Sequence, residues 1–285
     1  MKITNKYSLP EPLYRAISYD SGPRTGFSVT DLIQPPRMTQ LTRRHWDEIE
    51  VDASELIWKL LGSSVHFVLA HAMKEAATEK TLRAEIAGVE VSGRFDYRLN
   101  HAIHDYKLTS VWNVIFDPKG RAEYHPQLNS YAYLNYLVDG TIIDELIVWP
   151  ILRDWQANKL RTEPGYPPIP IVKIDIPVWP LEKTKAYLES RVKMHKVAET
   201  LPDDQLPLCT GEDMWQKKEQ WAVMKPGQKR AVRLFDTENA ACNCRNQLPF
   251  GGVYVVRREG TRARCERFCD VNRWCNQYAD YKKAK

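Results

Sequence analysis

The fold of this chain is decided by residues 82–108, which read LRAEIAGVEVSGRFDYRLNHAIHDYKL. Three short runs in this stretch are rich in alternating apolar residues, which is typical of strands. These runs are 82–86, 89–99 and 102–108. Gly88 marks the first turn, and Asn100 with His101 marks the second. We therefore predict three consecutive strands that are joined by tight turns.

The segments around these strands alternate between helix and strand. Residues 52–78 place apolar side chains at helical spacing, and Asp52 or Ser54 can supply the N-cap. After the strands, residues 121–138 return to helical spacing, and residues 142–152 read as a buried strand rich in Ile, Val and Leu. The order helix, three strands, helix, strand predicts an α/β (α+β) core, with a mixed central sheet flanked by helices.

The whole chain divides into three predicted parts. Residues 1–50 are expected to be irregular, with a proline pair at 35–36. Residues 51–200 form the predicted core, which ends in a charged amphipathic helix at 181–200. Residues 201–285 form a basic, cysteine-rich module that we expect to pack on the core.

The formal charge of the chain is unevenly distributed. The chain is 43% hydrophobic and 27% charged, as in an ordinary globular protein, and its net charge is +5. Residues 225–285 contain 14 Lys and Arg against 6 Asp and Glu, whereas the rest contains 27 against 30. This basic segment suggests a polyanionic partner such as DNA, although a solvated basic face would have the same composition.

The apolar runs of the chain are too short to cross a membrane. The longest, at 142–152, is interrupted by Asp144 and Glu145. A membrane-spanning helix needs roughly 18–20 apolar residues. The N-terminus also lacks the apolar segment of a signal peptide. We therefore expect a cytoplasmic protein that has no membrane partner.

Asp96, Asp105 and Lys107 are the candidate catalytic residues. Asp96 lies on the second predicted strand, and adjacent antiparallel strands bring their side chains together. Asp105 and Lys107 are two residues apart on the third strand, so they point to the same face. Carboxylates bind Mg²⁺ or Mn²⁺, which can activate water, and a lysine can stabilise developing charge. The charges of a solvated strand face can produce the same pattern by chance.

Four short motifs, which occur in a particular order, support a catalytic role for these residues. They are Gly62-x-x-x-His66, Gly93-Arg94-Phe95-Asp96, Asp105-Tyr106-Lys107 and Gln127-x-x-x-Tyr131. In these motifs the chain resembles RecB-like nucleases of the PD-(D/E)XK superfamily, which include CRISPR-associated and phage-encoded iron–sulfur exonucleases. The motifs span residues 62–131, and a weaker similarity runs from about residue 28 to the C-terminus. The proline that the superfamily name places before Asp96 is absent, as it is in many RecB-like members.

The resemblance implies a restriction-endonuclease-like core and a metal site within it. By this resemblance, His66, Asp96 and Asp105 would be metal ligands, joined by the backbone carbonyl of Tyr106. Lys107 would be the catalytic lysine.

The resemblance also implies contacts with the substrate. Gln127 and Tyr131 are four residues apart on the predicted helix, so they share a face. By resemblance they would contact the DNA strand near the scissile phosphate. Glu85, on the first predicted strand, is either a further acidic residue of the site or a surface charge.

All six cysteines lie after residue 208. In a reducing compartment such clustering favours a metal or an iron–sulfur cluster over disulfides. Cys265, Cys269 and Cys275 are closely spaced, and thiolates at such spacing can hold one metal centre with a fourth from elsewhere. The iron–sulfur relatives use one distant cysteine and a C-terminal group of three, which implies a 4Fe–4S cluster with Cys209 as the distant ligand.

Two details of the cysteine pattern differ from those relatives. Their inner spacing is usually C-x2-C, and their distant cysteine often precedes the core. Zinc held by four thiolates is the main alternative, and free thiols are the simplest one. Cys242 and Cys244 lie in a predicted helix at 238–247. They are expected to be ordinary reduced thiols, because a spacing of two places them on different sides of that helix.

Together these features predict a metal-dependent DNA exonuclease. Its expected setting is phage or bacterial DNA recombination, repair or processing, with recombination or repair proteins as possible partners. The alternative is a non-catalytic DNA-binding or adaptor protein that retains the nuclease fold. The presence of Asp96, Asp105 and Lys107 favours the enzyme, because a degenerate site usually loses one of these groups.

Overall fold

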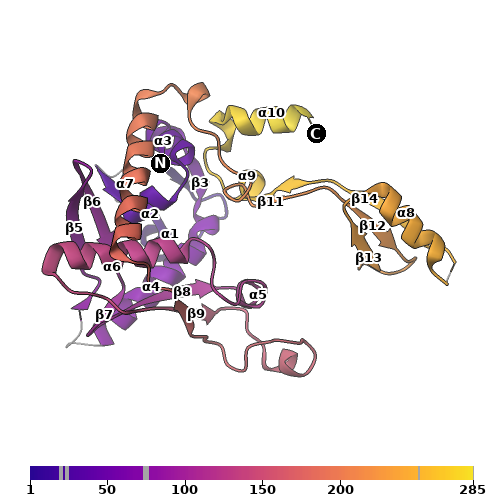
Figure 1. Cartoon of the computed structure of the whole chain (residues 1–285), viewed down its shortest axis with the longest axis horizontal. Helices are drawn as coiled ribbons and strands as arrows, with labels where there is room; N and C mark the ends of the chain where they lie inside the picture. The colour runs from indigo at the N-terminus through magenta and orange to yellow at the C-terminus, as the bar shows by residue number, and fades with distance from the viewer. Residues whose placement is uncertain (19–21, 23–25, 73–76, 250, 285) are drawn as a thin grey trace. The chain divides into compact units, whose positions relative to one another are not determined.

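The chain folds into two compact units, Met1–Leu201 and Pro202–Lys285 (Figure 1). The computed structural model describes all residues except 19–21, 23–25, 73–76, 250 and 285. Helices and strands occur in both units, so the fold is mixed α/β. Within the described part of the chain, no helix is both long and apolar enough to span a bilayer.

The central sheet of the first unit has the strand order β10-β9-β8-β7-β4. The strands are β4 (Ala77–Thr78), β7 (Tyr97–Leu99), β8 (Ala102–Thr109), β9 (Glu145–Leu152) and β10 (Ile174–Ile176). Strand β8 pairs antiparallel with β7 and parallel with β9, so the sheet is mixed as predicted. Ile103 and Val148, on β8 and β9, are fully buried and contribute to the core.

A second sheet divides the predicted strand 89–99 in two. Its order is β2 (Phe27–Ser28), β6 (Val89–Arg94) and β5 (Thr81–Ile86), whereas β7 belongs to the central sheet. The break falls at Phe95 and Asp96. Phe95 is fully buried, and the Asp96 carboxylate accepts a hydrogen bond from the Tyr106 backbone N–H. Asp96 therefore lies between two strands and not on one, because its side chain is tied to β8.

The helices of the first unit surround these sheets. Helix α4 (Ile57–Ala72) follows a 3-10 turn, η2 (Ala53–Leu56), whose N-cap is Asp52. The predicted helix 52–78 is thus too long, because Ala77 and Thr78 form β4; residues 73–76 lie outside the described residues. Helix α6 (Tyr124–Asp139) ends at Gly140, whose φ of 71° is left-handed, and α7 (Leu181–Thr200) has the predicted bounds.

The prediction of an irregular segment at 1–50 is wrong, because most of this segment is folded. Its elements are β1 (Lys2–Thr4), α1 (Glu11–Ser18), β2, α2 (Val29–Ile33), α3 (Pro36–Arg44), η1 (Trp46–Glu48) and β3 (Glu50–Asp52). Ser28 and Asp31 form a capping box at the start of α2. Pro36 starts α3, where its missing N–H is not needed. The proline pair therefore marks a helix start, and elements this short give little periodic signal.

The core of the first unit lies where α6, α7 and α2 pack on the sheets. Figure 1 shows α6 and α7 crossing one another over the strands. Leu128 and Leu134 of α6 and Leu188 of α7 are fully buried. Complete burial of one such side chain contributes roughly 1.5–3 kcal/mol to stability. The core thus fixes α6, which carries Gln127 and Tyr131, against the strands that carry the carboxylates.

The second unit is built from a short β-ribbon, a small sheet and three helices. The sheet has the order β13 (Arg233–Phe235), β12 (Gln220–Met224) and β14 (Tyr254–Arg258). The ribbon is β11 (Gln216–Lys217) with β15 (Thr261–Arg262). The helices are α8 (Glu238–Gln247), α9 (Ala263–Arg267) and α10 (Asn276–Ala284). Other short elements of the chain are α5 (Val111–Phe116), η3 (Ala157–Arg161), η4 (Asp203–Gln205) and η5 (Asn272–Trp274).

Candidate metal site and four-cysteine group

Asp96 and Asp105 lie side by side because β7 and β8 are paired. Tyr97, the first residue of β7, is opposite His104 of β8. Asp96 precedes this pair, so it lies across from Asp105. The Tyr106 backbone N–H donates to Asp96 Oδ2 at 2.7 Å and orients the carboxylate. The two acidic residues that the sequence singled out are therefore brought together.

Asp105 and Lys107 form a close ion pair on one face of β8. Lys107 Nζ lies 2.7 Å from Asp105 Oδ2, and Asp105 is almost completely buried. Burial raises the pKa of Asp105, although the Lys107 charge lowers it and offsets part of the rise. Burial lowers the pKa of Lys107, but the Asp105 carboxylate outweighs this effect and the pKa rises. We assign the ion pair, because a neutral carboxyl would leave the half-buried Lys107 ammonium without a counter-charge.

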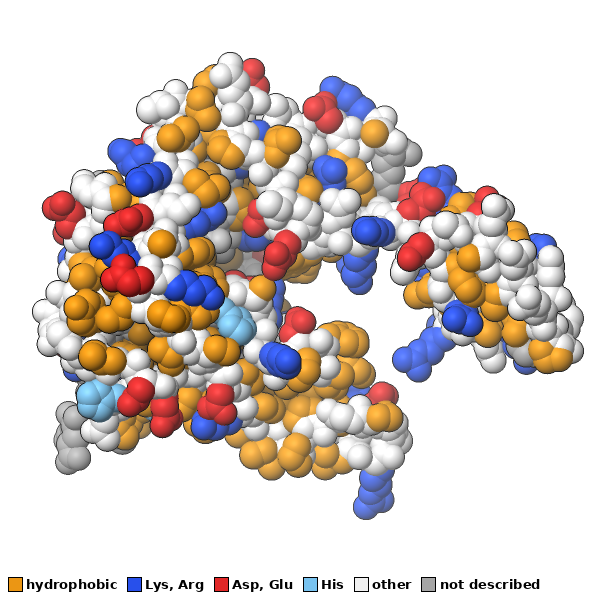
Figure 2. Space-filling view, in the orientation of Figure 1, with side chains coloured by type: hydrophobic (Ala, Val, Ile, Leu, Met, Phe, Trp, Pro, Cys, Tyr) orange, Lys and Arg blue, Asp and Glu red, His pale blue; other side chains and the backbone are white. Residues whose placement is uncertain are grey.

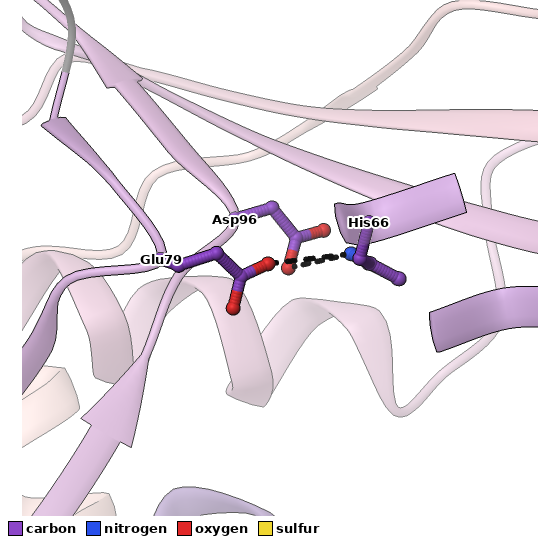
Figure 3. Close-up of side chains that lie close together, drawn as sticks. All are labelled: His66, Glu79 and Asp96. Atoms are coloured by element: carbon purple, nitrogen blue, oxygen red, sulfur yellow. Dashed lines mark ion pairs between the residues drawn. The ribbon is translucent and has the colours of Figure 1, made fainter. Parts of the chain in front are cut away.

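His66 extends from α4 toward the same two strands. Its Nδ1 lies 3.2 Å from Asp96 Oδ1 and 3.7 Å from Glu79 Oε1. The hydrogen bond to Asp96 raises the pKa of His66, although burial acts against the rise. His66, Glu79 and Asp96 offer ligand atoms that all lie within 4.8 Å of one another. In Figure 3 these three side chains point toward a common centre.

The chemistry of these donors suits a hard divalent cation. One imidazole nitrogen and two carboxylates match Mn²⁺ or Mg²⁺ better than a soft metal. Asp105 is a neighbour of this set, and its charge affects the pKa of His66. Its Oδ2 is buried and has no well-aligned hydrogen-bond partner among the described residues. Because this oxygen also lies 2.7 Å from Lys107 Nζ, a metal ion would share the Asp105 carboxylate with that ammonium.

Glu79 is the site residue that the sequence analysis missed. It lies between β4 and β5, and its N–H donates to the Asp96 carbonyl at 3.0 Å. Its φ of 48° is left-handed, which is uncommon for Glu. Arg94 Nε contacts the second carboxylate oxygen at 2.9 Å. No linear motif marks Glu79, because it lies in the short gap between the predicted helix 52–78 and the predicted strand 82–86.

Glu85, the other acidic residue considered on the first strand, lies elsewhere. It is exposed on β5, and its cross-strand partner is Glu90 of β6. Its side chain does not line the cleft at the carboxylates. Glu85 is therefore a surface charge.

The carboxylates open into a cleft of about 820 Å³ within the first unit. Its lining residues include Phe67 and His71 of α4, Arg83 and Arg94 of the second sheet, and Gln127 and Tyr131 of α6. Gln127 Nε2 donates to the Tyr131 hydroxyl at 3.0 Å. Tyr131 is almost completely buried and lines the cleft. Tyr106 lines a smaller cavity of about 150 Å³ beside His66 and Asp96.

Gly93 of the second motif is required by packing. A Cβ at this position would lie 2.7 Å from Leu134 Cδ1 and 3.0 Å from Tyr131 Cδ1. Both distances are shorter than normal carbon contacts. Helix α6 therefore approaches β6 closely only because residue 93 has no side chain, and this approach brings Tyr131 to the cleft.

Four of the six cysteines come together in the second unit, and we call them the four-cysteine group. They are Cys209, Cys265, Cys269 and Cys275. Burial raises the pKa of Cys209 to about 12, and the Asp213 carboxylate and the three other thiols add to the rise. Gln277 fixes the loop of Cys209 by accepting from its N–H at 2.9 Å and donating to its carbonyl at 2.8 Å.

Cys242 and Cys244 lie apart from this group in the sequence and in their contacts. Both are half-buried on α8, as the predicted helix 238–247 implied. The thiols that act on the pKa of Cys209 belong to the four-cysteine group alone.

Comparisons with known proteins do not identify the function of this chain. No family model matches this chain, and no curated protein matches its sequence. The crystal structure of SSO0001 is 16% identical with a TM-score of 0.43, covering 64% of this chain and 84% of that one. An alkaline exonuclease from Laribacter hongkongensis is 10% identical with a TM-score of 0.35, covering 59% of this chain and 90% of that one. Likenesses this weak carry no argument about function.

Proposed function

We propose that this protein is a Mg²⁺- or Mn²⁺-dependent deoxyribonuclease that degrades DNA from an end. The observation that carries the proposal is the convergence of His66, Glu79 and Asp96 beside the Asp105–Lys107 pair, in an open cleft. A divalent ion at such a site polarises the phosphate and lowers the pKa of a bound water. Acidic residues around a single lysine also favour a metal-assisted attack on a phosphodiester.

The residues of the chain divide this work between them. His66, Asp96 and Asp105 would hold the ion, with Glu79 as a further carboxylate and the Tyr106 carbonyl as a backbone ligand. Lys107 would orient the attacking water and stabilise the charge that develops on the phosphate. Asp105 keeps this ammonium in place through the 2.7 Å ion pair.

The helix α6 would guide the DNA strand. Gln127 and the Tyr131 hydroxyl face the cleft and are already hydrogen-bonded to one another. Both can donate to phosphate oxygens, which are the usual protein contacts on a nucleic-acid backbone. Such contacts position the strand without reading its sequence.

For the second unit we propose a 4Fe–4S cluster on the four-cysteine group. A single zinc ion, with Zn–S distances of about 2.3 Å, requires four sulfurs in close contact. A cluster takes one thiolate at each iron and tolerates a wider separation. The pattern of one distant cysteine and a C-terminal group of three, which resembles that of the iron–sulfur nucleases, supports the cluster over zinc. Its role would be structural, because the ligands come from distant parts of the unit.

Digestion of end-labelled DNA by the anaerobically purified protein tests the proposed function. We expect progressive shortening of linear DNA with Mg²⁺ or Mn²⁺, and none with EDTA. Covalently closed circular DNA should not be digested, because it has no end. Binding without cleavage in either metal would instead support the non-catalytic DNA-binding or adaptor protein. Products of this reaction would serve phage or bacterial recombination, repair or DNA processing, the setting that we propose.

The role of Glu79 is tested by Glu79→Gln, which removes the charge and keeps the shape. We expect Mn²⁺ affinity to fall by at least about 10-fold, the lower limit for substitutions in the outer shell of a metal site. Excess metal should restore part of the cleavage rate. Titration of Mn²⁺ by calorimetry measures the change. Glu85→Gln, on the exposed face of β5, is the matched control and should bind Mn²⁺ normally. Equal affinities in the two variants would remove Glu79 from the site.

A further inference from the structure

The segment 220–258 of the second unit carries the whole formal charge of the chain. It comprises β12, β13, α8 and β14. The chain has 41 Lys and Arg and 36 Asp and Glu; this segment has seven and two, so the remaining residues have 34 of each. The positive potential of the protein is therefore concentrated on this small sheet and its helix, which suits a polyanion.

The strand register places three exposed apolar side chains on one face of this sheet. Ala222 of β12 is paired with Leu234 and with Val256, and Met224 is paired with Tyr254. Cross-strand partners share a face, so Leu234, Tyr254 and Val256 lie together. Their exposed fractions are 42%, 45% and 38%. We call this face, with Arg258 at its edge, the Tyr254 face.

Helix α8 covers the opposite side of the sheet. By the same register, Trp221, Val223, Phe235 and Val255 share that side and are buried or half-buried, whereas Arg233 and Arg257 share it and are exposed. On the central strand, Ala222 and Met224 of the Tyr254 face are buried as well. Helix α8 contacts each of the three strands. The apolar side chains of the edge strands are therefore less exposed on the Trp221 side, which assigns α8 to that side and leaves Leu234, Tyr254 and Val256 uncovered.

Basic side chains lie in the same segment, 220–258, as the exposed apolar side chains. Arg258 follows Val256 at a spacing of two, and its Nη2 lies 3.6 Å from Met224 Sδ on the Tyr254 face. Lys229 and Arg230 are exposed in the loop between β12 and β13. Figure 2 shows hydrophobic and Lys or Arg side chains adjoining one another on this part of the surface. An exposed apolar patch with a charged rim is typical of a binding site.

We infer that the Tyr254 face binds an unpaired DNA strand. Tyr254 offers a ring on which a base can stack, Leu234 and Val256 extend the apolar surface, and the basic side chains contact phosphates. An unpaired strand fits better than a duplex, because only unpaired bases expose the faces that an apolar surface can contact. The positive charge also disfavours a basic partner. The inference rests on the proposed function only for the identity of the nucleic acid as DNA.

The test measures binding of the full-length protein in EDTA, so that no cleavage occurs. The probes are a fluorescent thymidine oligonucleotide and a duplex of equal length. Tyr254→Ala should weaken binding of the oligonucleotide by about 10-fold, the loss expected for one stacked base. Tyr254→Phe should bind normally, because it keeps the ring. Duplex affinity should change little in either variant.

Two further comparisons make the test specific. Tyr136→Ala is the matched control, because Tyr136 is 40% exposed but lies on α6 in the first unit. The double variant Lys229→Gln/Arg230→Gln should lower the slope of log affinity against log salt by about 1.4, since each lost phosphate contact on a single strand accounts for about 0.7. An unchanged melting temperature shows that each variant is folded.

The inference and the proposed function fail separately. Equal oligonucleotide affinity in wild type and Tyr254→Ala overturns the inference, even if the protein digests DNA. An equal loss for oligonucleotide and duplex overturns it too, because stacking would not be involved. No affinity of the wild type for the oligonucleotide would do the same and would favour an acidic protein as partner. Normal binding without digestion contradicts only the proposed function.

Discussion

Replacing Asp96 with asparagine is expected to reduce DNA cleavage by at least about 1000-fold. Metal-assisted stabilisation of charge is worth several kcal/mol, and each 1.36 kcal/mol corresponds to a factor of about ten in rate. The neutral amide of the Asp96→Asn variant cannot supply the anionic oxygen that an ion at His66 and Glu79 would need, although it can still accept the Tyr106 N–H. The fold should therefore persist. Single-turnover digestion at saturating Mg²⁺ and Mn²⁺ measures the loss.

Companion variants separate metal binding from the chemical step. Lys107→Gln should lose turnover but retain Mn²⁺ affinity, because Lys107 is not a ligand in the proposed site. Asp144→Asn changes an exposed aspartate before β9 and should leave cleavage unchanged. Wild-type cleavage by Asp96→Asn would refute the metal site. Asp105→Asn is a less clean variant, because it leaves the half-buried Lys107 ammonium without its partner and should also lower stability.

Replacing any residue of the four-cysteine group with alanine is expected to abolish the metal centre of the second unit. The thiols come from residues 209 to 275, so bound metal couples their positions to folding. The anaerobically purified protein should be brown and contain iron and sulfide. Cys265→Ala, Cys269→Ala, Cys275→Ala and Cys209→Ala should each lose the colour and become less soluble. Metal analysis and absorption spectra measure these changes.

The two remaining cysteines are internal controls for this experiment. Cys242→Ala and Cys244→Ala should keep the colour, since neither thiol acts on Cys209. A colourless wild type with stoichiometric zinc would replace the cluster by a zinc site and would leave the nuclease proposal standing. Retention of the cluster in Cys209→Ala would show that the fourth ligand is another residue.

Local pattern was sufficient for the elements that are long or strongly periodic. The bounds predicted for the helices 181–200 and 238–247 match α7 and α8. The spacing of two between Asp105 and Lys107 was also sufficient to place them on one face, because side chains alternate along a strand. Shorter elements were missed at 1–50, where helices of five to nine residues contain too few turns to show a period.

The grouping of the fourth cysteine with the other three, and the division of the second predicted strand, could not be predicted from local sequence patterns. Spacing alone indicated a group of three cysteines, and the contact between Cys209 and Gln277 of α10 brings the fourth thiol to them. The run 89–99 alternates without a visible interruption, yet it contributes to two sheets. The interruption depends on a hydrogen bond between Asp96 and Tyr106, which are ten residues apart.

The order of helices and strands and the catalytic candidates Asp96, Asp105 and Lys107 could be predicted from sequence, because periodicity and motif spacing are properties of neighbouring residues. The folded structure was needed to show that Glu79 joins His66 and Asp96, and that Leu234, Tyr254 and Val256 share an uncovered face. Both results depend on which backbone turns and strands meet in space. These contacts arise from hydrogen bonds and packing between distant segments, so they cannot be predicted from a local sequence pattern.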